Sequence, residues 1–404
     1  MVKFAAQLIL IIIFSSFLAS CSVLNFNFFS SKKPTPAPLE KFDPKINLSE
    51  KWIIQVGPNN VLNSGIGSFG PQVTKNRAIT TSGSGVISAY DLSNGNQIWK
   101  ISLDQKVLCS VGYRKVDDDE LIAAISEMGE LILLKSTGKV NWASKLDGIV
   151  RVPPVITNSV VVTLYADNRV VAYDLISGKR IWAVKRRVPP LILHGQSGMT
   201  LISSSKNSTK LSSDFENGLI VNMAGGRMVF LNATTGTVNW ESRIAFSRGT
   251  NEVERISDLL GNPHVDNDVC TTAYQNSLVC LSLLNGEVLW RKAFNSVQPA
   301  FFSDASVIAI DSDSKLSAFR RNEKNLMWKS EKFFLRKISA PVIWQSAVWF
   351  VDGQGYLHGL SLFNGKVISR YKLKDGLLSG MIKIVQDGIL IQTAGGQLVL
   401  LKKT

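Results

Sequence analysis

The side chains that do chemistry in proteins are few in this sequence and lie far apart. Its three histidines are His194, His264 and His358, and no acidic cluster with the spacing of metal ligands accompanies them. A metal that activates water, or a redox cofactor, needs its ligands gathered at one place. The sequence also lacks a glycine-rich phosphate loop and a Gly-x-Ser-x-Gly nucleophile motif. We therefore predict no catalytic residues, no metal site and no cofactor, and the pattern favours binding over catalysis.

One cysteine, Cys21, has a predicted chemistry of its own. Lys3 precedes an apolar run over residues 4–17, which indicates a secretory signal and is shorter than the roughly 20 apolar residues of a membrane-spanning helix. The run ends in Leu18-Ala19-Ser20-Cys21, which resembles the lipobox of bacterial lipoproteins. The resemblance implies cleavage before Cys21 and acylation of its thiol, with each buried CH2 contributing about 0.8 kcal/mol to membrane anchoring. Because Ser22 follows instead of Asp, it also implies the outer membrane, on its periplasmic face.

The chain after the lipobox is predicted to be a tether. It has aromatic residues near its start and then a stretch with prolines at four positions, Pro34, Pro36, Pro38 and Pro44. Such a composition favours an extended, solvated and semi-rigid chain. We expect a signal peptide at 1–20, a lipidated N-terminus and proline-rich tether at 21–47, and a single folded domain at 48–404.

Three cysteines remain beyond the lipobox, an odd number for an oxidising compartment. They are Cys109, Cys270 and Cys280. The last two are expected on adjacent strands of one hairpin. The sequence leaves open whether they form a disulfide or are apolar core thiols.

The elements that hold these residues belong to an internal repeat. The composition, 45% hydrophobic and 19% charged over 404 residues, indicates a large core built from short strands and tight turns. Five turns carry a glycine followed four residues later by tryptophan, and two worn copies keep only Trp328 or Gly365. Successive tryptophan positions lie 38–58 residues apart, the period of propeller blades. The five complete pairs are Gly95/Trp99, Gly138/Trp142, Gly178/Trp182, Gly236/Trp240 and Gly286/Trp290.

The two ends of the domain predict how the blades close into a ring. The final stretch "GGQLVLLKKT" matches the strand before the turn and then stops, whereas "SEKWIIQVG" at 49–57 matches the strand after it. We therefore predict an all-β fold, an eight-bladed β-propeller with four-stranded antiparallel blades. Its last blade joins the N- and C-terminal strands, which removes exposed edges. We expect the repeated tryptophans to pack between neighbouring blades.

Lipobox, tether and repeats together resemble the BamB family of lipoproteins, which belong to the outer-membrane β-barrel assembly machinery. "LILHGQSG" at 191–198 is similar to a family element that usually has Arg at the position of His194. "GTNEVERISDLLGNP" at 249–263 is similar to a second element, in which Leu260 stands where the family has a second Asp. The resemblance implies that these elements bind the POTRA domains of BamA. The implied partner-binding residues are Leu191, Leu193, His194, Arg255 and Asp258.

The positions of these two stretches agree with a shared surface. Each follows a repeat tryptophan, Trp182 or Trp240, and precedes the first strand of the next blade. Equivalent connections in a propeller lie on one face, and long connections commonly build binding surfaces. We therefore expect both stretches on one rim of the ring, one blade apart, with Leu191, Leu193, Arg255 and Asp258 presented to a partner.

These observations predict a non-enzymatic scaffold of the barrel-assembly complex, anchored to the outer membrane and in contact with nascent outer-membrane proteins. The alternative is a periplasmic quinone-dependent dehydrogenase, because such repeats also occur in that class of enzyme.

The formal net charge of +14 could attract nucleic acid, anionic lipid or acidic protein. The predicted export argues against nucleic acid, and Lys185-Arg186-Arg187 is the basic run nearest the first stretch.

Overall fold

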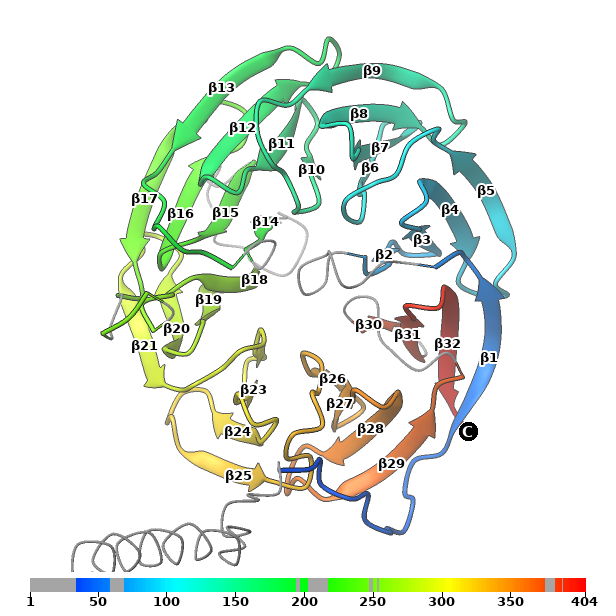
Figure 1. Ribbon diagram of the computed structural model, residues 1–404, viewed down its shortest axis with the longest axis vertical. Helices are drawn as coiled ribbons and strands as arrows, with labels where there is room; N and C mark the ends of the chain where they lie inside the picture. The colour runs from blue at the N-terminus through cyan, green and yellow to red at the C-terminus, as the bar shows by residue number, and fades with distance from the viewer. Residues whose placement is uncertain are drawn as a thin grey trace, which may run out of the picture. The chain divides into compact units, whose positions relative to one another are not determined.

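The computed structural model describes residues 34–58, 69–193, 197–202, 217–246, 250–252, 254–374, 382–386 and 388–404. Cys21 and His194 lie outside these residues. Residues 37–404 form one compact unit. Its strands pair into eight four-stranded antiparallel sheets arranged as the blades of a propeller (Figure 1). The predicted fold class is confirmed. Nowhere in the described ranges is there a helix of the length and apolarity that crossing a membrane requires.

The blades follow one another along the chain, each from its inner to its outer strand. The first blade contains β2 (Gln72–Val73), β3 (Arg77–Thr81), β4 (Val86–Asp91) and β5 (Gln97–Ser102), and the second contains β6 (Gly112–Val116), β7 (Asp119–Ile125), β8 (Glu130–Lys135) and β9 (Val140–Lys145). The third contains β10 (Val155–Ile156), β11 (Val160–Leu164), β12 (Arg169–Asp174) and β13 (Arg180–Lys185), and the fourth contains β14 (Met199–Leu201), β15 (Gly218–Met223), β16 (Arg227–Asn232) and β17 (Val238–Arg243).

The remaining blades complete the ring. The fifth blade contains β18 (Leu259–Val265), β19 (Asp268–Ala273), β20 (Ser277–Ser282) and β21 (Val288–Ala293), and the sixth contains β22 (Phe301–Phe302), β23 (Ser306–Ile310), β24 (Leu316–Arg320) and β25 (Leu326–Ser330). The seventh contains β26 (Val342–Trp344), β27 (Ala347–Val351), β28 (Tyr356–Ser361) and β29 (Val367–Lys372), and the eighth contains β30 (Lys383–Val385), β31 (Gly388–Gln392), β32 (Gln397–Lys403) and β1 (Leu48–Gln55).

The eighth blade is closed by strands from both ends of the domain, as predicted. β1 pairs antiparallel with β32, from Leu48 opposite Lys403 to Gln55 opposite Gln397. Figure 1 shows β1 in blue beside the red β32. Trp52 of β1 is buried and packs with Leu398 and Leu400 of β32. This pairing covers the β32 edge, which would otherwise expose unpaired backbone groups.

The repeated tryptophans seal the joints between blades, as predicted. Trp142 of the second blade lies over Gly178 in the last turn of the third, and a Cβ at Gly178 would meet the indole at 2.6 Å. The Trp142 Nε1 donates to the Leu175 carbonyl of that same turn, at 2.9 Å. Gly178 also has φ +69°, which glycine adopts without strain. The same contact joins Trp52 to Gly95, Trp182 to Gly236, Trp240 to Gly286 and Trp328 to Gly365.

Antiparallel strand order divides the chain's connections between two faces of the ring. The turns between the third and fourth strands of each blade, which hold the repeat glycines, lie on one face, here the turn face. The turns between second and third strands, and the connections from one blade to the next, lie on the opposite face, here the loop face. Both predicted binding stretches therefore fall on the loop face.

Candidate functional site

The two stretches similar to the family elements adjoin in the structure. The first lies between β13 and β14, and the second leads into β18. Ser197 and Gly261 form a parallel bridge. The Thr200 hydroxyl donates to the Pro263 carbonyl at 2.7 Å. The expected neighbourhood is thus present, and one backbone bridge and one side-chain hydrogen bond hold it together.

A buried carboxylate joins the two stretches. Asp258 has no exposed surface. Its Oδ2 accepts the Leu193 N–H at 2.6 Å, and its Oδ1 accepts the Gly225 N–H at 2.7 Å. Gly225 lies in the β15–β16 turn with φ +78°. The expectation that Asp258 faces a partner is therefore corrected: its carboxylate points into the domain and positions the backbone of the first stretch. Asp258 is a positioning residue because a carboxylate makes strong hydrogen bonds to backbone N–H groups.

The leucines of the first stretch differ in exposure. Leu191 is 39% exposed, and Leu193 is partly buried. Leu193 lines a small cleft with Tyr165 of the third blade and Ala224 of the fourth. The cleft and the hydrogen bond to Asp258 hold Leu193 in place. Leu191 is therefore the most exposed apolar side chain in the described part of this stretch.

The charged residues of the second stretch lie on the surface, whereas Leu260, where this chain departs from the family pattern, does not. Arg255 and Glu252 are exposed, and the Arg255 N–H donates to the Glu252 carbonyl at 3.2 Å. Leu260 is buried in β18. The missing second Asp is thus replaced by a core side chain, so this difference changes packing rather than an exposed charge.

Sequence reasoning missed two residues that shape this surface. Asn168 lies in the β11–β12 turn with φ +59°. Its side-chain amide donates to the Arg187 and Ala224 carbonyls, and its Oδ1 accepts the Ala224 N–H at 3.1 Å. Asn168 thereby fixes the start of the connection that carries Leu191. An asparagine in a tight turn was the available signal, since asparagine tolerates positive φ. Gly225, described above, is the second.

Exposed apolar side chains from neighbouring connections extend the surface. Beside Leu191 on the loop face, Val188 belongs to the same connection, Phe246 follows β17, and Ile149 precedes β10. The Arg243 guanidinium lies over the Phe246 ring, 5.0 Å from its centroid. Arg151 and Leu193 line the same cleft, so the connection that holds Ile149 adjoins the first stretch. Several apolar groups on one rim are typical of a protein-binding surface.

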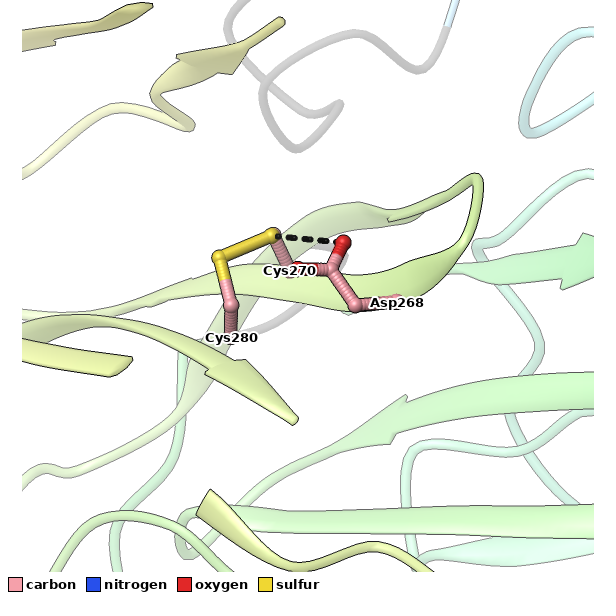
Figure 2. Close-up of side chains that lie close together, drawn as sticks. All are labelled: Asp268, Cys270 and Cys280. Atoms are coloured by element: carbon pink, nitrogen blue, oxygen red, sulfur yellow. Dashed lines mark hydrogen bonds between the residues drawn. A yellow bond between two sulfur atoms is a disulfide. The ribbon is translucent and has the colours of Figure 1, made fainter. Parts of the chain in front are cut away.

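The potential metal ligands and histidines form no open site among the described residues. The group identified there is Asp268, Cys270 and Cys280, and its two sulfurs are joined in a disulfide between β19 and β20 (Figure 2). This settles the alternative that the sequence left open. The Asp268 carboxylate is paired with Arg321. Cys109 is a buried free thiol, and burial raises its pKa to about 12.

The two histidines within the described ranges are apart and buried to different extents. His264 stacks on Phe302, and burial lowers its pKa. His358 has no exposed surface and contacts Asp352 at 2.9 Å. A His–Asp pair is found in many active sites, but Arg336 also binds this carboxylate, and both members are fully buried. The pair stabilises the seventh blade.

Eight blades, closed by both ends of the domain and sealed by interblade tryptophans, define a β-propeller with quinoprotein-like repeats. A family model described as outer membrane protein assembly factor BamB matches residues 83–330. The chain belongs to the BamB family.

Individual relatives cover nearly the whole chain. Outer membrane protein assembly factor BamB of Bordetella pertussis is 30% identical over 388 residues, which are 95% of this chain and 94% of that protein. The protein of the same name in Escherichia coli is 24% identical over 394 residues, 94% of each chain. The structure of BamB from Moraxella catarrhalis is similar with a TM-score of 0.72 and 21% identity, covering 88% of this chain and 100% of that one.

An enzyme shares the architecture. The quinohemoprotein alcohol dehydrogenase from Comamonas testosteroni is similar with a TM-score of 0.63 and 12% identity, covering 90% of this chain and 78% of that one. Similarity at this level of identity shows the fold alone, since one fold supports many functions.

Proposed function

We propose that this protein is a non-enzymatic scaffold lipoprotein of the outer-membrane β-barrel assembly complex, and that its loop face binds the POTRA domains of BamA. Membership of the BamB family supports the assembly role. One structural observation carries the proposed interface: Asp258 joins the two stretches into one surface and leaves Leu191 exposed on it. Binding would hold the POTRA domains in a productive arrangement while nascent outer-membrane proteins fold.

The surface has the composition of a binding hot spot. Leu191 supplies an exposed apolar anchor, and Arg255 supplies hydrogen-bond donors nearby in the second stretch. The basic run Lys185-Arg186-Arg187 precedes the first stretch. Arg186 is paired with Glu241, so Lys185 and Arg187 are the members that would steer an acidic partner by long-range attraction. His194, in the position that the family usually gives to Arg, lies outside the described residues. It is part of the proposed contact on the resemblance alone.

Leu191→Ala is expected to weaken binding to the isolated POTRA domains by about 2 kcal/mol or more, the usual size of a hot-spot effect. Its stability should fall by about 1 kcal/mol or less, because the side chain is only partly buried. Calorimetric titration and thermal melts measure the two effects separately. Ile176→Ala is the matched control, since Ile176 is 88% exposed on the turn face. Undiminished affinity of Leu191→Ala, or an equal loss in both variants, contradicts the proposed surface.

We further propose that acyl chains on Cys21 hold the protein at the periplasmic face of the outer membrane. Replacing Cys21 by Ser is expected to leave the signal uncleaved by the lipoprotein peptidase and to remove the acyl mass. Mass spectrometry of the purified full chain checks both. A wild-type chain that is cleaved but carries no acyl mass would disprove the anchor and leave the proposed interface untouched.

A further inference from the structure

Residues 37–47, here called the strap, lie against the seventh blade. At its start the Ala37 N–H donates to the Phe334 carbonyl at 3.0 Å, and the Arg336 Nη1 donates to the Ala37 carbonyl at 2.8 Å. At its end the Lys45 and Ile46 N–H groups donate to the Ile368 carbonyl at 2.9 and 3.1 Å. The Ile46 side chain is buried in the core shared by the seventh and eighth blades.

Side chains hold the middle of the strap. The Arg370 Nη2 donates to the Glu40 carbonyl at 3.1 Å, and its guanidinium lies over the Phe42 ring, 4.9 Å from the centroid. Lys332 forms an ion pair with the Glu40 carboxylate. A cation over the face of an aromatic ring is attracted by the ring's quadrupole. The strap is therefore attached at both ends and in between.

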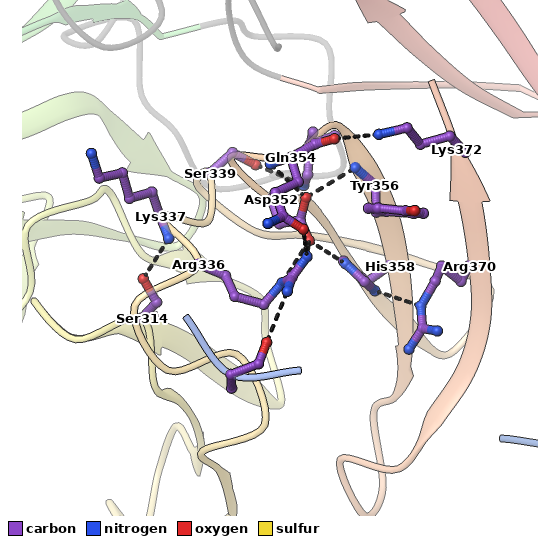
Figure 3. Close-up of polar contacts among 12 residues, drawn as sticks. Ser314, Arg336, Lys337, Ser339, Asp352, Gln354, Tyr356, His358, Arg370 and Lys372 are labelled. Atoms are coloured by element: carbon purple, nitrogen blue, oxygen red, sulfur yellow. Dashed lines mark hydrogen bonds and ion pairs between the residues drawn. The ribbon is translucent and has the colours of Figure 1, made fainter. Parts of the chain in front are cut away.

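The two arginines that hold the strap are themselves held by a buried polar network (Figure 3). The Asp352 carboxylate accepts the Arg336 Nε–H at 2.8 Å and contacts the His358 Nε2 at 2.9 Å. The Arg370 Nε–H donates to the His358 Nδ1 at 3.4 Å. Arg336 also donates to the Gln354 side chain at 2.7 Å. The guanidinium groups are thus oriented before they contact the strap, which reduces the entropy lost on contact.

The protonation states of Asp352 and His358 allow this network to hold the two arginines. Burial would raise the pKa of Asp352, but hydrogen bonds from His358, the Tyr356 N–H and Arg336 outweigh it and lower the pKa to about 2. Burial lowers the pKa of His358, although its contact with Asp352 opposes this. A neutral His358 that donates from Nε2 to Asp352 leaves Nδ1 as the acceptor for Arg370. Each polar contact in the network then has a donor and an acceptor.

The topology fixes where the strap begins. Phe334 and Arg336 belong to the connection from β25 to β26, so Ala37 lies at the loop face. Ile368 lies near the start of β29, beside its turn-face end, so the strap crosses the blade from the loop face toward the turn face. β1 then returns along β32. Ala37, the first residue of the strap, therefore lies on the same face that carries Leu191.

We propose that the strap fixes the exit of the lipidated leader on the loop face and shortens the free tether. Only residues 21–36 would then remain as a leash, with a reach of roughly 55 Å when extended, against roughly 90 Å for 21–47. The membrane and the proposed partner surface would lie on the same side of the propeller. This membrane consequence rests on the proposed acylation of Cys21, whereas docking of the strap does not.

Hydrogen exchange of the full-length protein tests docking. Amides 37 and 45–46 are expected to be protected in the wild type. The double variant Glu40→Lys/Phe42→Ala, which leaves the buried network intact, is expected to increase their exchange at least tenfold without changing β29. Lys41→Ala is the matched control, because Lys41 is exposed on the same segment. Unprotected wild-type amides overturn the proposal.

Energy transfer tests the exit face. One variant, Glu331→Cys, carries a dye at the loop-face end of β25. A second, Phe363→Cys, carries it on the turn face, in the turn that holds Gly365. Energy should pass to acceptor lipids more efficiently from the first dye than from the second. The measurement uses acylated protein on phosphatidylethanolamine and phosphatidylglycerol vesicles. Releasing the strap should reduce the difference between the labels. Equal transfer from the two dyes, with the strap intact, overturns the exit-face assignment. If the protein does not bind vesicles although its strap amides are protected from exchange, only the proposed acylation is refuted.

Discussion

Deleting residues 48–57 is expected to abolish the cooperative unfolding transition and to make the protein aggregate. These residues contain β1, whose register with β32 extends from Leu48 to Gln55. Without them, β32 becomes an exposed edge with a row of unpaired backbone groups, which promotes association with other chains. Burial of Trp52 is lost as well, and truncating a buried tryptophan alone typically costs about 3–5 kcal/mol. This is comparable to a whole domain's net stability of about 5–15 kcal/mol.

Point variants make this prediction testable even if the deletion cannot be purified. Trp52→Ala should lower the free energy of unfolding by about 3–5 kcal/mol. Lys51→Ala, a neighbouring exposed position, should change it by less than about 0.5 kcal/mol. Urea denaturation followed by tryptophan fluorescence measures both, with circular dichroism as a second probe. A deletion variant that melts at the wild-type temperature would mean that β1 does not close the ring in solution.

Asp258→Ala is expected to destabilise the protein by about 3–5 kcal/mol and to weaken partner binding indirectly. The change removes a buried acceptor of two backbone N–H groups, from Leu193 and Gly225. Hydrogen bonds to charged groups contribute about 1.5–3 kcal/mol each, and the two buried donors would be left unsatisfied. The stretch that carries Leu191 would then lose its attachment to the second stretch.

Two control variants separate positioning from direct contact. Asp258→Asn keeps an acceptor for one N–H and should cost less stability than Asp258→Ala. Arg255→Ala removes an exposed side chain of the same stretch and should leave the melting temperature nearly unchanged. Chemical denaturation gives the stability, and calorimetry with POTRA domains gives the affinity. A fully stable Asp258→Ala variant would show that the carboxylate does not hold the two stretches.

Much of the fold could be read from local sequence because propeller blades are built from local patterns. Each glycine that takes positive φ before a tryptophan marks one hairpin, and the spacing of these pairs predicts the blades. Lys324 shows that a worn copy keeps the geometry, since it adopts φ +60° in place of glycine. The incomplete strands at 49–57 and 397–403 predicted their own pairing, because each lacked the partner that every internal repeat supplied.

The same logic predicted that two connections share a face but not how their side chains lie. Equivalent chain positions in a ring are fixed by strand order alone, so the rim could be assigned without coordinates. Whether Asp258 points outward depends on Leu193 and Gly225, which are 65 and 33 residues away in the chain. An aspartate beside an exposed arginine is equally consistent with a surface charge and with a buried acceptor.

By itself the sequence determined the blade number, the closure of the ring and the face on which the two family-like stretches lie, because strand alternation, turn glycines and repeat spacing are local properties. Tertiary structure alone decided that Asp258 is buried, that Cys270 and Cys280 are bonded, and that residues 37–47 lie on the seventh blade. The burial of Asp258 and the docking of residues 37–47 depend on contacts between segments far apart in the chain. The Cys270–Cys280 bond lies within one predicted hairpin, and whether it forms depends on how the two paired side chains are oriented. The strap contacts carbonyls some 300 residues away, and only the closed ring brings those groups together.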